Sequence, residues 1–260
     1  ELVLYYQPKV DIRTNQMVGV EALMRWRRGD KLVPPSDFIP LAEATGLINE
    51  MSIWAITQAA RQSKIWQAEF GFDAAIAVNL PSRIFERADL IETIESILKA
   101  ENVSPRTIEL EITETGLMKD LQGVVPSLHK LNQIGVEISI DDFGTGYSSL
   151  AYLTSLPISE LKIDRSFVRD LGTTPQSSAV VSAIIALARA LGLRVIAEGV
   201  EQVSQMEVLH HLGCHVCQGF LYARPMPAQD IGRWLQSHPA LPAADVLCGH
   251  GSSVQEALAN

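Results

Sequence analysis

Two adjacent aspartates followed by a glycine-containing turn are the sharpest chemical signal in the sequence. Asp141 and Asp142 directly follow an apolar, β-branched stretch, and Gly144 and Gly146 come shortly after them. Two carboxylates a few ångströms apart in a buried cleft raise one another's pKa unless a cation lies between them. A divalent metal ion removes this conflict, whereas a solvated acidic turn is the alternative that the same residues allow.

Five further stretches end in the same way, with an apolar run followed by a residue that can bind a metal ion or move a proton. These residues are Asn79, Glu111, Lys162 with Asp164, Glu198 and Gln218. Amide and carboxylate oxygens suit hard cations, a lysine stabilises negative charge on a phosphoryl group, and a glutamate accepts protons. Each residue alone also fits a turn, a helix cap or a buried ion pair. Their common position at six expected strand ends indicates a site.

Strand alternation adds candidates near the N-terminus. Successive side chains of a strand point to opposite faces, so Glu21, Leu23 and Arg25 share one face. The guanidinium of Arg25 is suited to phosphate, although a structural ion pair with Glu21 explains the same pattern. Alternation also puts Glu109 and Glu111 on one side of a strand, facing either solvent or the interior of a sheet. In the interior, the two carboxylates need a partner.

Short apolar strands and helices alternate along most of the chain, which predicts a parallel sheet with its strand ends at one edge. The expected strands of this part are Ala74–Asn79, Thr107–Ile112, Val136–Asp141, Glu160–Ile163, Arg194–Ala197 and His215–Gln218. The expected helices are Ser82–Ala100, Leu121–Ile134, Ser148–Leu153, Arg165–Leu171, Pro175–Leu191, Gln202–Leu212 and Ala228–Gln236. This order predicts a (β/α) barrel with the functional groups at one mouth.

The N-terminal region departs from the regular alternation. The stretches Leu2–Ile12 and Met17–Trp26 alternate like strands and are joined by a polar turn, which predicts an antiparallel hairpin. Helices ending at Ala44 and spanning Asn49–Phe70 follow. We therefore expect the barrel to begin irregularly.

Length and composition predict one large domain. The 260 residues match a single (β/α) barrel, and 47% hydrophobic and 20% charged residues are ordinary for a globular protein. We expect that domain over residues 1–239 and a flexible tail over residues 240–260, where Ala, Pro, Gly and Ser dominate. The net charge of −9 argues against binding to long nucleic acid. No transmembrane or signal segment is visible in the sequence.

The cysteines predict neither a disulfide scaffold nor a strong metal site. Cys214, Cys217 and Cys248 are an odd number and too few for a scaffold, which favours a reducing, cytoplasmic setting. Cys214 and Cys217 lie near His210 and His215, a combination that suggests zinc, but no second cysteine pair follows. We favour small core residues as the explanation of this pair.

Together, these motifs resemble the EAL-domain family, bacterial phosphodiesterases that act on the second messenger cyclic di-GMP. The resemblance covers about residues 2–237, nearly the whole chain. It is carried by Tyr6-Gln7-Pro8, Glu21-Ala22-Leu23-Met24-Arg25, Asn79, Glu111-Ile112-Thr113-Glu114, Asp141–Leu150, Lys162-Ile163-Asp164, Ala197–Glu201 and Gln218-Gly219. So many motifs in one order make the resemblance specific.

The resemblance implies a modified TIM-type (β/α)8 barrel whose first strand runs antiparallel to the others. It also implies two Mg²⁺ or Mn²⁺ ions. The first ion would be held by Glu21, Asn79, Glu111 and Asp141; Asp141 would bridge to the second, helped by Asp142 and, through water, by Glu198. Lys162 would orient the nucleophilic water, and Glu198 would act as the general base.

Substrate contacts and loop support also follow from the resemblance. Gln7, Leu23, Arg25 and Gln218 would contact cyclic di-GMP, whereas Glu114, Asp164 and Glu201 would stabilise loops, Glu114 holding the loop that begins at Asp141. In the family this loop couples the site to a dimer interface, so we expect a homodimer. We also expect sensory or other signalling domains fused to this one in a cytoplasmic protein, which a parent chain could tether to a membrane.

The expected reaction is hydrolysis of cyclic di-GMP to linear pGpG by two-metal catalysis. One alternative is a catalytically silent receptor of cyclic di-GMP, although such family members usually lose metal ligands and this chain retains them. Another, argued from the barrel alone, is an enolase-like enzyme that uses Lys162 as its base. That reading explains Arg25 and the paired aspartates less well.

Overall fold

The computed structural model describes residues 1–146, 150–173 and 175–237. The tail expected over residues 240–260 lies outside the described residues, as do Ser148 and Ser149 of one expected helix. The remaining expected elements fall within the described parts of the chain.

Eight strands close into a barrel, and a ninth strand extends one edge of it. The strands are β1 (Leu2–Asp11), β2 (Gln16–Arg28), β3 (Lys31–Val33), β4 (Ile76–Asn79), β5 (Ile108–Thr113), β6 (Glu137–Phe143), β7 (Glu160–Ile163), β8 (Arg194–Ala197) and β9 (Val216–Cys217). Their order is β1-β9-β8-β7-β6-β5-β4-β2-β3, and a further pairing between β1 and β2 closes the ring. The predicted (β/α)8-type barrel is confirmed.

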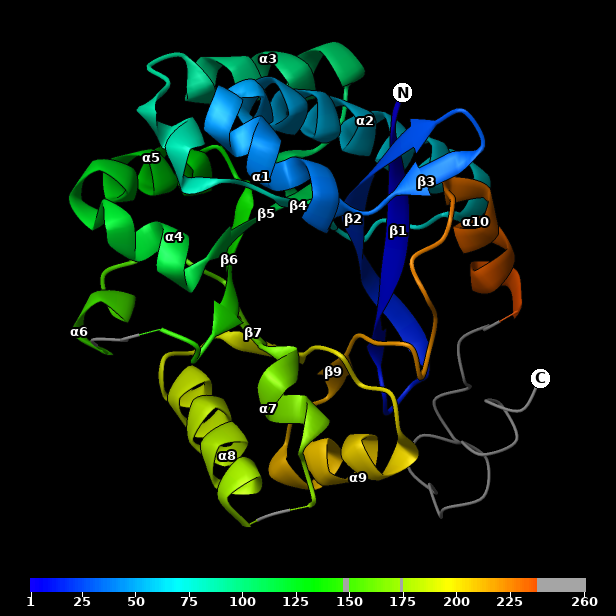
Figure 1. The fold of residues 1–260 in the computed structure, drawn as a ribbon, viewed down its shortest axis with the longest axis vertical. Coiled ribbons are helices and arrows are strands. Elements are labelled where there is room, and N and C mark those ends of the chain that lie inside the picture. Colours follow the sequence, from blue (N-terminus) through cyan, green and yellow to red (C-terminus); the bar gives the residue numbers. More distant parts are fainter. Residues whose placement is uncertain (147–149, 174, 238–260) are drawn as a thin grey trace.

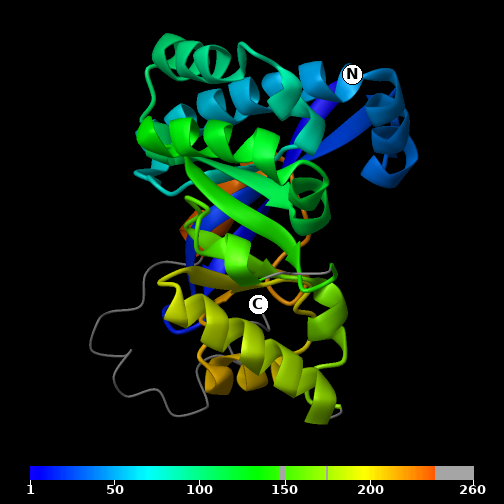
Figure 2. The same cartoon turned by 90° about the vertical axis from the view of Figure 1, so that its left-hand side faces the viewer.

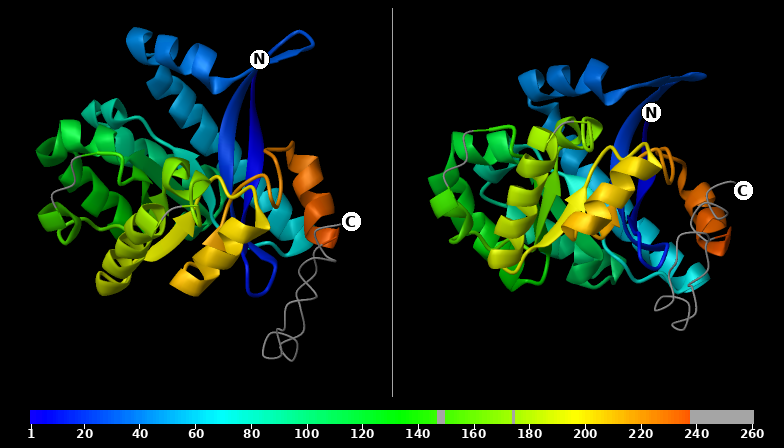
Figure 3. Two further views of the ribbon diagram at one scale, coloured as in Figure 1. Left: turned by 60° about the horizontal axis from the view of Figure 1, so that its bottom comes forward. Right: turned by 90° about the horizontal axis from the view of Figure 1, so that it is seen from below.

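The first strand runs against the rest of the barrel. β1 pairs antiparallel with both β2 and β9, whereas the neighbouring strands from β2 through β4 to β9 pair in parallel. The short strand β3 folds back on β2, and Figure 3 shows the turn between them projecting beyond the barrel. The expected antiparallel first strand is therefore confirmed.

Helices surround the strands, as Figures 1 and 2 show. They are α1 (Pro35–Thr45), α2 (Leu47–Phe70), α3 (Leu90–Glu101), α4 (Glu114–Lys119), α5 (Leu121–Gln133), α6 (Leu150–Leu153), α7 (Arg165–Arg169), α8 (Pro175–Ala190), α9 (Val203–Leu212) and α10 (Ala228–Ser237), with the 3₁₀ helices η1 (Ser82–Glu86) and η2 (Pro105–Thr107). Within the described residues, no helix combines the length and the apolar character needed to cross a membrane.

One expected helix is wrong as a single element. Instead of a continuous helix over Ser82–Ala100, the chain forms η1, leaves the helical conformation at Arg87, and begins α3 at Leu90. Arg87 donates to both carboxylate oxygens of Asp89, at 3.0 and 2.8 Å, which stabilises the break. Periodicity alone does not reveal such an interruption, because apolar residues continue on both sides of it.

Alternation along the strands separates an apolar outer layer from a polar interior. In β5, Ile108, Leu110 and Ile112 are fully buried under the helices, whereas Glu109 and Glu111 point into the barrel and meet lysines there. Burial of each such aliphatic side chain contributes roughly 1.5–3 kcal/mol. The helix-covered layer stabilises the barrel, and the interior is free to carry charged groups.

Candidate metal-binding active site

Lys162 lies at the centre of an acidic cluster at the carboxyl ends of the strands. Its Nζ is 2.6 Å from Glu198 Oε1, 2.8 Å from Glu111 Oε2, 3.3 Å from Asp141 Oδ1 and 3.6 Å from Glu21 Oε2. The lysine side chain is fully buried. Side chains from β2, β5, β6, β7 and the end of β8 thus converge, as expected for parallel strands that share one mouth.

A chain of amide groups extends the cluster across β4, β2, β9 and β1. Asn79 Nδ2 donates to Glu21 Oε1 at 2.7 Å, and Gln218 Nε2 donates to Glu21 Oε2 at 2.6 Å. Gln218 Nε2 also reaches Gln7 Oε1 at 3.1 Å, and Gln7 Nε2 donates to the Ala223 carbonyl at 3.0 Å. Both oxygens of Glu21 are therefore held, and its carboxylate has a fixed orientation.

A bulge in β6 brings two consecutive aspartates to the same mouth. The register between β6 and β7 shifts between Ile140 and Phe143, and Asp142 has a positive φ of 54°. In a regular strand, neighbouring side chains point to opposite faces, but a bulge redirects one of them. The bulge explains how Asp141 and Asp142 both reach the site.

The carboxylates form two groups that have one member in common. Glu21, Glu111 and Asp141 form the first group, and Asp141, Asp142 and Glu198 form the second. Within each group, one oxygen from every residue lies within 4.8 Å of the others. Overlapping groups of three carboxylates are the donor arrangement that suits two neighbouring cations.

The donor set fits hard divalent cations. Within the described chain, the two oxygens of Glu111 make no well-aligned hydrogen bond, and Lys162 Nζ makes none either. Lys162 and Glu111 are nevertheless within ion-pair distance of each other. Buried polar atoms are normally satisfied by hydrogen bonds. The donors are carboxylate and amide oxygens rather than thiolates, which is the set that Mg²⁺ and Mn²⁺ prefer. The acidic groups are thus compatible with metal binding.

The charges in the cluster shift several pKa values. Burial raises the pKa of Glu198 to about 8 and that of Asp142 to about 6, with Asp141 adding repulsion in both cases. Burial and the neighbouring Glu21 also hold the pKa of Glu111 well above its ordinary value, against the attraction of Lys162. Without a metal ion, the cluster therefore retains protons that a cation would displace.

Lys162 remains an ammonium group despite its burial. Burial by itself lowers the pKa of Lys162, but the charges of Glu111 and Glu198 outweigh it and raise this pKa well above the ordinary value. The same lysine, with the hydrogen bond from Gln218, lowers the pKa of Glu21 although burial opposes this. The mouth therefore contains one fixed positive charge among several carboxylates.

Two of the three expected loop-supporting residues make side-chain contacts with nearby loops. Glu114 Oε2 accepts a hydrogen bond from the Gly144 N–H at 2.8 Å, across thirty positions of sequence. Asp164 caps α7 by accepting from the Ser166 N–H at 3.0 Å. Glu201 is exposed, and its backbone N–H donates to Gln205 Oε1 at 2.8 Å. The roles assigned to these residues stay predictions.

A cavity of about 650 Å³ lies beside the acidic cluster. Leu23 and Asn79 line it where it borders the cluster, and Ile39 of α1 and Thr115 of α4 line it farther away. Arg25 lies on β2, as Leu23 does, and is half-buried. Its Nη1 donates to the Met24 carbonyl at 2.9 Å. Leu23 and Arg25 therefore lie near the cluster without contacting its carboxylates, and their substrate contacts stay predictions.

Lys9 is the charged residue of this region that sequence reasoning missed. It is buried in the interior, and its Nζ contacts Glu109, Glu111 and Glu160. Burial opposes its charge, but these carboxylates raise the pKa of Lys9 well above its ordinary value. The available signal was the alternation that puts Lys9 on the face of Gln7, together with the need of Glu109 and Glu111 for an inward partner.

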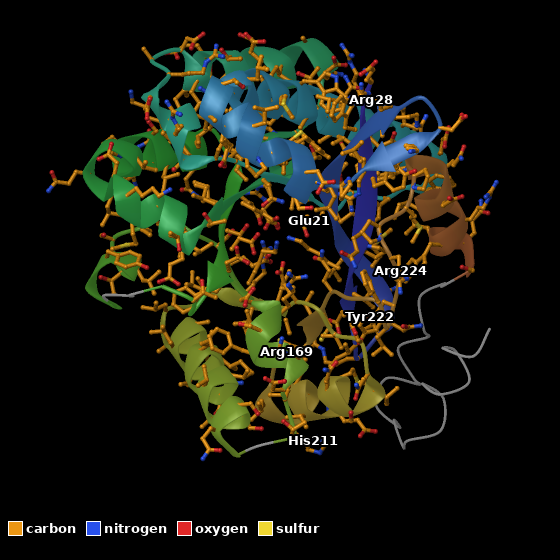
Figure 4. All side chains as sticks on the ribbon, in the orientation of Figure 1. Glu21, Arg28, Arg169, His211, Tyr222 and Arg224 are labelled. Atoms are coloured by element: carbon orange, nitrogen blue, oxygen red, sulfur yellow. The ribbon has the colours of Figure 1, made fainter. Side chains whose placement is uncertain are left out.

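The histidine and cysteine segment lies apart from the carboxylates. Figure 4 shows Glu21 among the side chains inside the barrel, whereas His211 lies at the far end on α9. Cys214 and Cys217 are both buried as free thiols. Among the described residues, the groups of three or more metal-ligating side chains are the two carboxylate groups, and neither contains a histidine or a cysteine.

The sequence of the chain was compared with the sequence patterns of known protein families. The sequence pattern of the EAL domain matches residues 1–225. The chain belongs to the EAL domain family. The expected family is thereby confirmed, and the site described above is the strand-end cluster of an EAL domain.

Curated relatives carry this domain within longer proteins. The bifunctional diguanylate cyclase/cyclic di-GMP phosphodiesterase MucR of Pseudomonas aeruginosa is 47% identical over 232 residues, which are 89% of this chain and 34% of MucR. The cyclic di-GMP phosphodiesterase PdeR of Escherichia coli is 38% identical over 239 residues, covering 92% of this chain and 36% of PdeR. The chain thus spans about a third of the length of these relatives.

Solved structures agree with the fold. The PaMucR phosphodiesterase in complex with c-di-GMP superposes with a TM-score of 0.84 at 47% identity, covering 88% of this chain and 94% of that one. The EAL domain of Mycobacterium smegmatis DcpA gives a TM-score of 0.80 at 34% identity, covering 93% of this chain and all of that one. These likenesses extend over nearly the whole barrel.

Proposed function

We propose that this EAL domain hydrolyses cyclic di-GMP to linear pGpG with two bound divalent ions, Mg²⁺ or Mn²⁺. The observation that carries the proposal is the presence of Asp141 in both groups of three carboxylates. MucR and PdeR, which are named as cyclic di-GMP phosphodiesterases, and the c-di-GMP complex of PaMucR support the substrate.

The two carboxylate groups divide the ligands between the ions. Glu21, Asn79, Glu111 and Asp141 would hold one ion. Asp141 and Asp142 would hold the other, with Glu198 helping through water. When bound, such a pair of ions lowers the pKa of water and stabilises negative charge on the phosphoryl oxygens. The close packing of Glu21, Glu111 and Asp141 around Lys162 supports this assignment.

Lys162 and Glu198 are the proposed proton-handling pair. Hydrolysis joins the oxygen of water to phosphorus, breaks the bond to the leaving ribose oxygen, and transfers a proton to that oxygen. Glu198 would accept the proton of the attacking water, a role that suits the most exposed of the carboxylates around Lys162. Lys162, 2.6 Å from Glu198, would donate hydrogen bonds that orient the water and the carboxylate.

The neighbouring residues would bind the nucleotide. Gln7 and Gln218 are hydrogen-bonded to each other beside Glu21, so their amides can recognise polar groups of the ligand at the mouth. Leu23 lines the adjacent cavity and would pack against an apolar face of the bound nucleotide. Arg25 would contact a phosphate through its guanidinium. Together they would orient one phosphodiester bond toward the acidic cluster.

The wider setting of the domain is also a proposal. Residues 1–239 would form the catalytic domain of a homodimer. Signalling domains would be fused to it in a cytoplasmic protein, and the matched residues, which make up only about a third of MucR and PdeR, support that organisation. Glu114, through Gly144, would hold the loop that connects the site with the dimer interface.

Chromatography of the nucleotide products tests the proposal. Purified protein incubated with cyclic di-GMP and Mn²⁺ should release pGpG, and an excess of chelator should stop the reaction. The Asp170→Asn variant, which changes an exposed aspartate paired with Arg169, is a matched control and should turn over normally. Binding of cyclic di-GMP without any pGpG would contradict hydrolysis and indicate a receptor. Turnover that continues in chelator would contradict the metal requirement.

A further inference from the structure

Lys9 lies one layer below the proposed metal site. β1 runs antiparallel to the other strands, so its chain descends from the mouth into the barrel. Gln7 hydrogen-bonds with Gln218 at the mouth, and Lys9 follows two residues later with 3% of its surface exposed. Because β1 runs from the mouth into the barrel, Lys9 lies deeper in the interior than Gln7.

A glycine on the neighbouring strand leaves room for the lysine stem. Lys9 pairs with Gly19 across β1 and β2. A Cβ atom at Gly19 would lie 3.4 Å from Lys9 Cδ and 3.3 Å from the Ala75 carbonyl oxygen, the second of which is a tight contact. The absent side chain therefore lets the aliphatic part of Lys9 pass along the interior toward β5.

The ammonium group of Lys9 meets three carboxylates, one of which belongs to the proposed metal site. Lys9 Nζ lies 3.0 Å from Glu109 Oε1, 3.0 Å from Glu111 Oε1 and 3.2 Å from Glu160 Oε1. Glu111 uses its other oxygen, Oε2, to contact Lys162 at 2.8 Å. The two lysines therefore hold the Glu111 carboxylate from opposite oxygens.

We propose that Lys9 is a positioning residue for the metal ligand Glu111: its ammonium group fixes Oε1 from below. Glu109 and Glu111 lie two residues apart on β5 and both point inward. Lys9 Nζ is the ion-pair partner of Glu111 Oε1, so without the ammonium group this oxygen loses the contact that sets the orientation of the carboxylate. Groups that orient metal ligands in this way typically change metal affinity by about 10- to 100-fold.

The inference rests on the proposed function, because it takes Glu111 as a metal ligand. It adds a residue that makes no contact with Glu21, Asp141 or Glu198 in the described structure. Its effect should therefore appear in metal affinity first. The KM for cyclic di-GMP at saturating metal should change little, because Lys9 lies below the layer that faces the ligand.

Calorimetric titration of the full chain with Mn²⁺ alone tests the inference. Lys9→Met keeps the stem and removes the ammonium group, and we expect it to bind Mn²⁺ about 10- to 100-fold more weakly than the wild type. Asp11→Asn is the matched control, because it removes a buried charge from the same strand whose partner is Arg13. That variant should bind Mn²⁺ with an affinity within about twofold of the wild type, because Asp11 orients none of the proposed metal ligands.

A second variant separates positioning from stability, since Lys9→Met alone leaves buried carboxylates without their cation. Lys9→Met/Glu109→Gln removes both charges of one pair and should recover much of the thermal stability. If Lys9 positions Glu111, Mn²⁺ affinity stays low in this double variant although stability returns. Recovery of wild-type affinity together with stability would overturn the inference, as would unchanged affinity in Lys9→Met.

The result also distinguishes this inference from the proposed function. If wild-type protein binds no Mn²⁺ and forms no pGpG, the proposed function fails. If the wild type binds Mn²⁺ and forms pGpG but both Lys9 variants bind the ion as tightly as it does, the role of Lys9 fails and the proposed function stands.

Discussion

Two fully enclosed lysines of the barrel interior have similar neighbours and different proposed tasks. Lys162 contacts four carboxylates at the mouth, and Lys9 contacts three in the layer below. Around Lys9 the acidic side chains are at most 5% exposed, whereas around Lys162 the side chain of Glu198 is 17% exposed. Glu21, Asp141 and Glu198 are thus partly open to solvent and ligands, whereas Glu111, which contacts both lysines, is fully buried.

Protonation distinguishes the two clusters as well. Beside Lys9, burial raises the pKa of both Glu109 and Glu160, and the charge of Lys9 lowers both. The result is a pKa of about 2 for Glu109 and about 7 for Glu160, so Glu109 is the carboxylate that accepts a hydrogen bond from Glu160. At the mouth, the carboxylates outnumber the lysine and form two overlapping groups of three. The lower cluster balances its own charge, while the upper cluster has an excess of negative charge that cations would neutralise.

The largest effect is expected from the carboxylate that both groups at the mouth contain. Asp141→Asn replaces the proposed charged ligand of both ions, so we expect pGpG formation to fall by about 10³-fold or more, since single groups that stabilise developing charge contribute roughly 10²–10³-fold. Steady-state product chromatography at saturating Mn²⁺ measures this. A rate within tenfold of the wild type would argue against a shared ligand.

Replacement of Lys162 should separate chemistry from metal binding. Lys162→Met removes the proposed orienting group, and we expect kcat to fall by about 10²–10³-fold. Mn²⁺ affinity should fall less than in Lys9→Met, because Lys162 contacts four carboxylates of the mouth, and the loss of its repulsion toward the proposed ions offsets the loss of its contact with Glu111 Oε2. Lys162→Met should therefore lower kcat more than metal affinity, and Lys9→Met should lower metal affinity more than kcat. Equal losses of metal affinity in both variants would remove the distinction between the two lysines.

A smaller effect is expected from the loop that carries Glu198. A Cβ atom at Gly219 would overlap the backbone O and N atoms of Val200, two residues beyond Glu198, so Gly219→Ala must displace that loop. Overpacking of this kind costs about 1–3 kcal/mol of stability. We expect a lower melting temperature and roughly 10-fold slower turnover, because displaced catalytic groups lose orientation. Wild-type rates in a folded variant would contradict the proposed role of Glu198.

The mildest test uses pH, which changes the protonation of the carboxylates at the mouth. The pKa values of about 8 for Glu198 and about 6 for Asp142 describe the metal-free cluster, and bound cations require these carboxylates to be ionised. Mn²⁺ affinity should therefore fall as pH drops through these values, by about tenfold per pH unit for each displaced proton. Titration calorimetry in buffers of different pH checks this. Glu198→Gln should flatten the upper part of the profile, and an affinity independent of pH would contradict the described charge state.

The sequence predicted the mouth of the barrel better than its interior. Asn79, Glu111, Asp141, Lys162 and Glu198 all follow apolar stretches, and parallel strands bring such positions together by topology alone. Alternation also predicted the N-terminal hairpin. These inferences needed only periodicity and the polar residue at each strand end, whereas the direction of the first strand relative to the whole barrel followed from the resemblance to the EAL-domain family.

Contacts across the barrel are what periodicity does not supply. Alternation put Glu109 and Glu111 on one face, but the partner Lys9 lies a hundred positions away, and its pairing depends on how the closed barrel brings β1 opposite β5. The bulge at Asp142 likewise depends on local backbone conformation. Such features are decided by three-dimensional packing rather than by the pattern of one strand.

The central claim, that two ions share Asp141, is tested most directly by electron paramagnetic resonance of the Mn²⁺-loaded protein. We expect two Mn²⁺ ions per chain with a spectrum that shows magnetic coupling between them. Asp141→Asn should lose the coupled spectrum, whereas the Asp170→Asn control should retain it. A wild-type spectrum of a single, uncoupled Mn²⁺ ion per chain would contradict the claim.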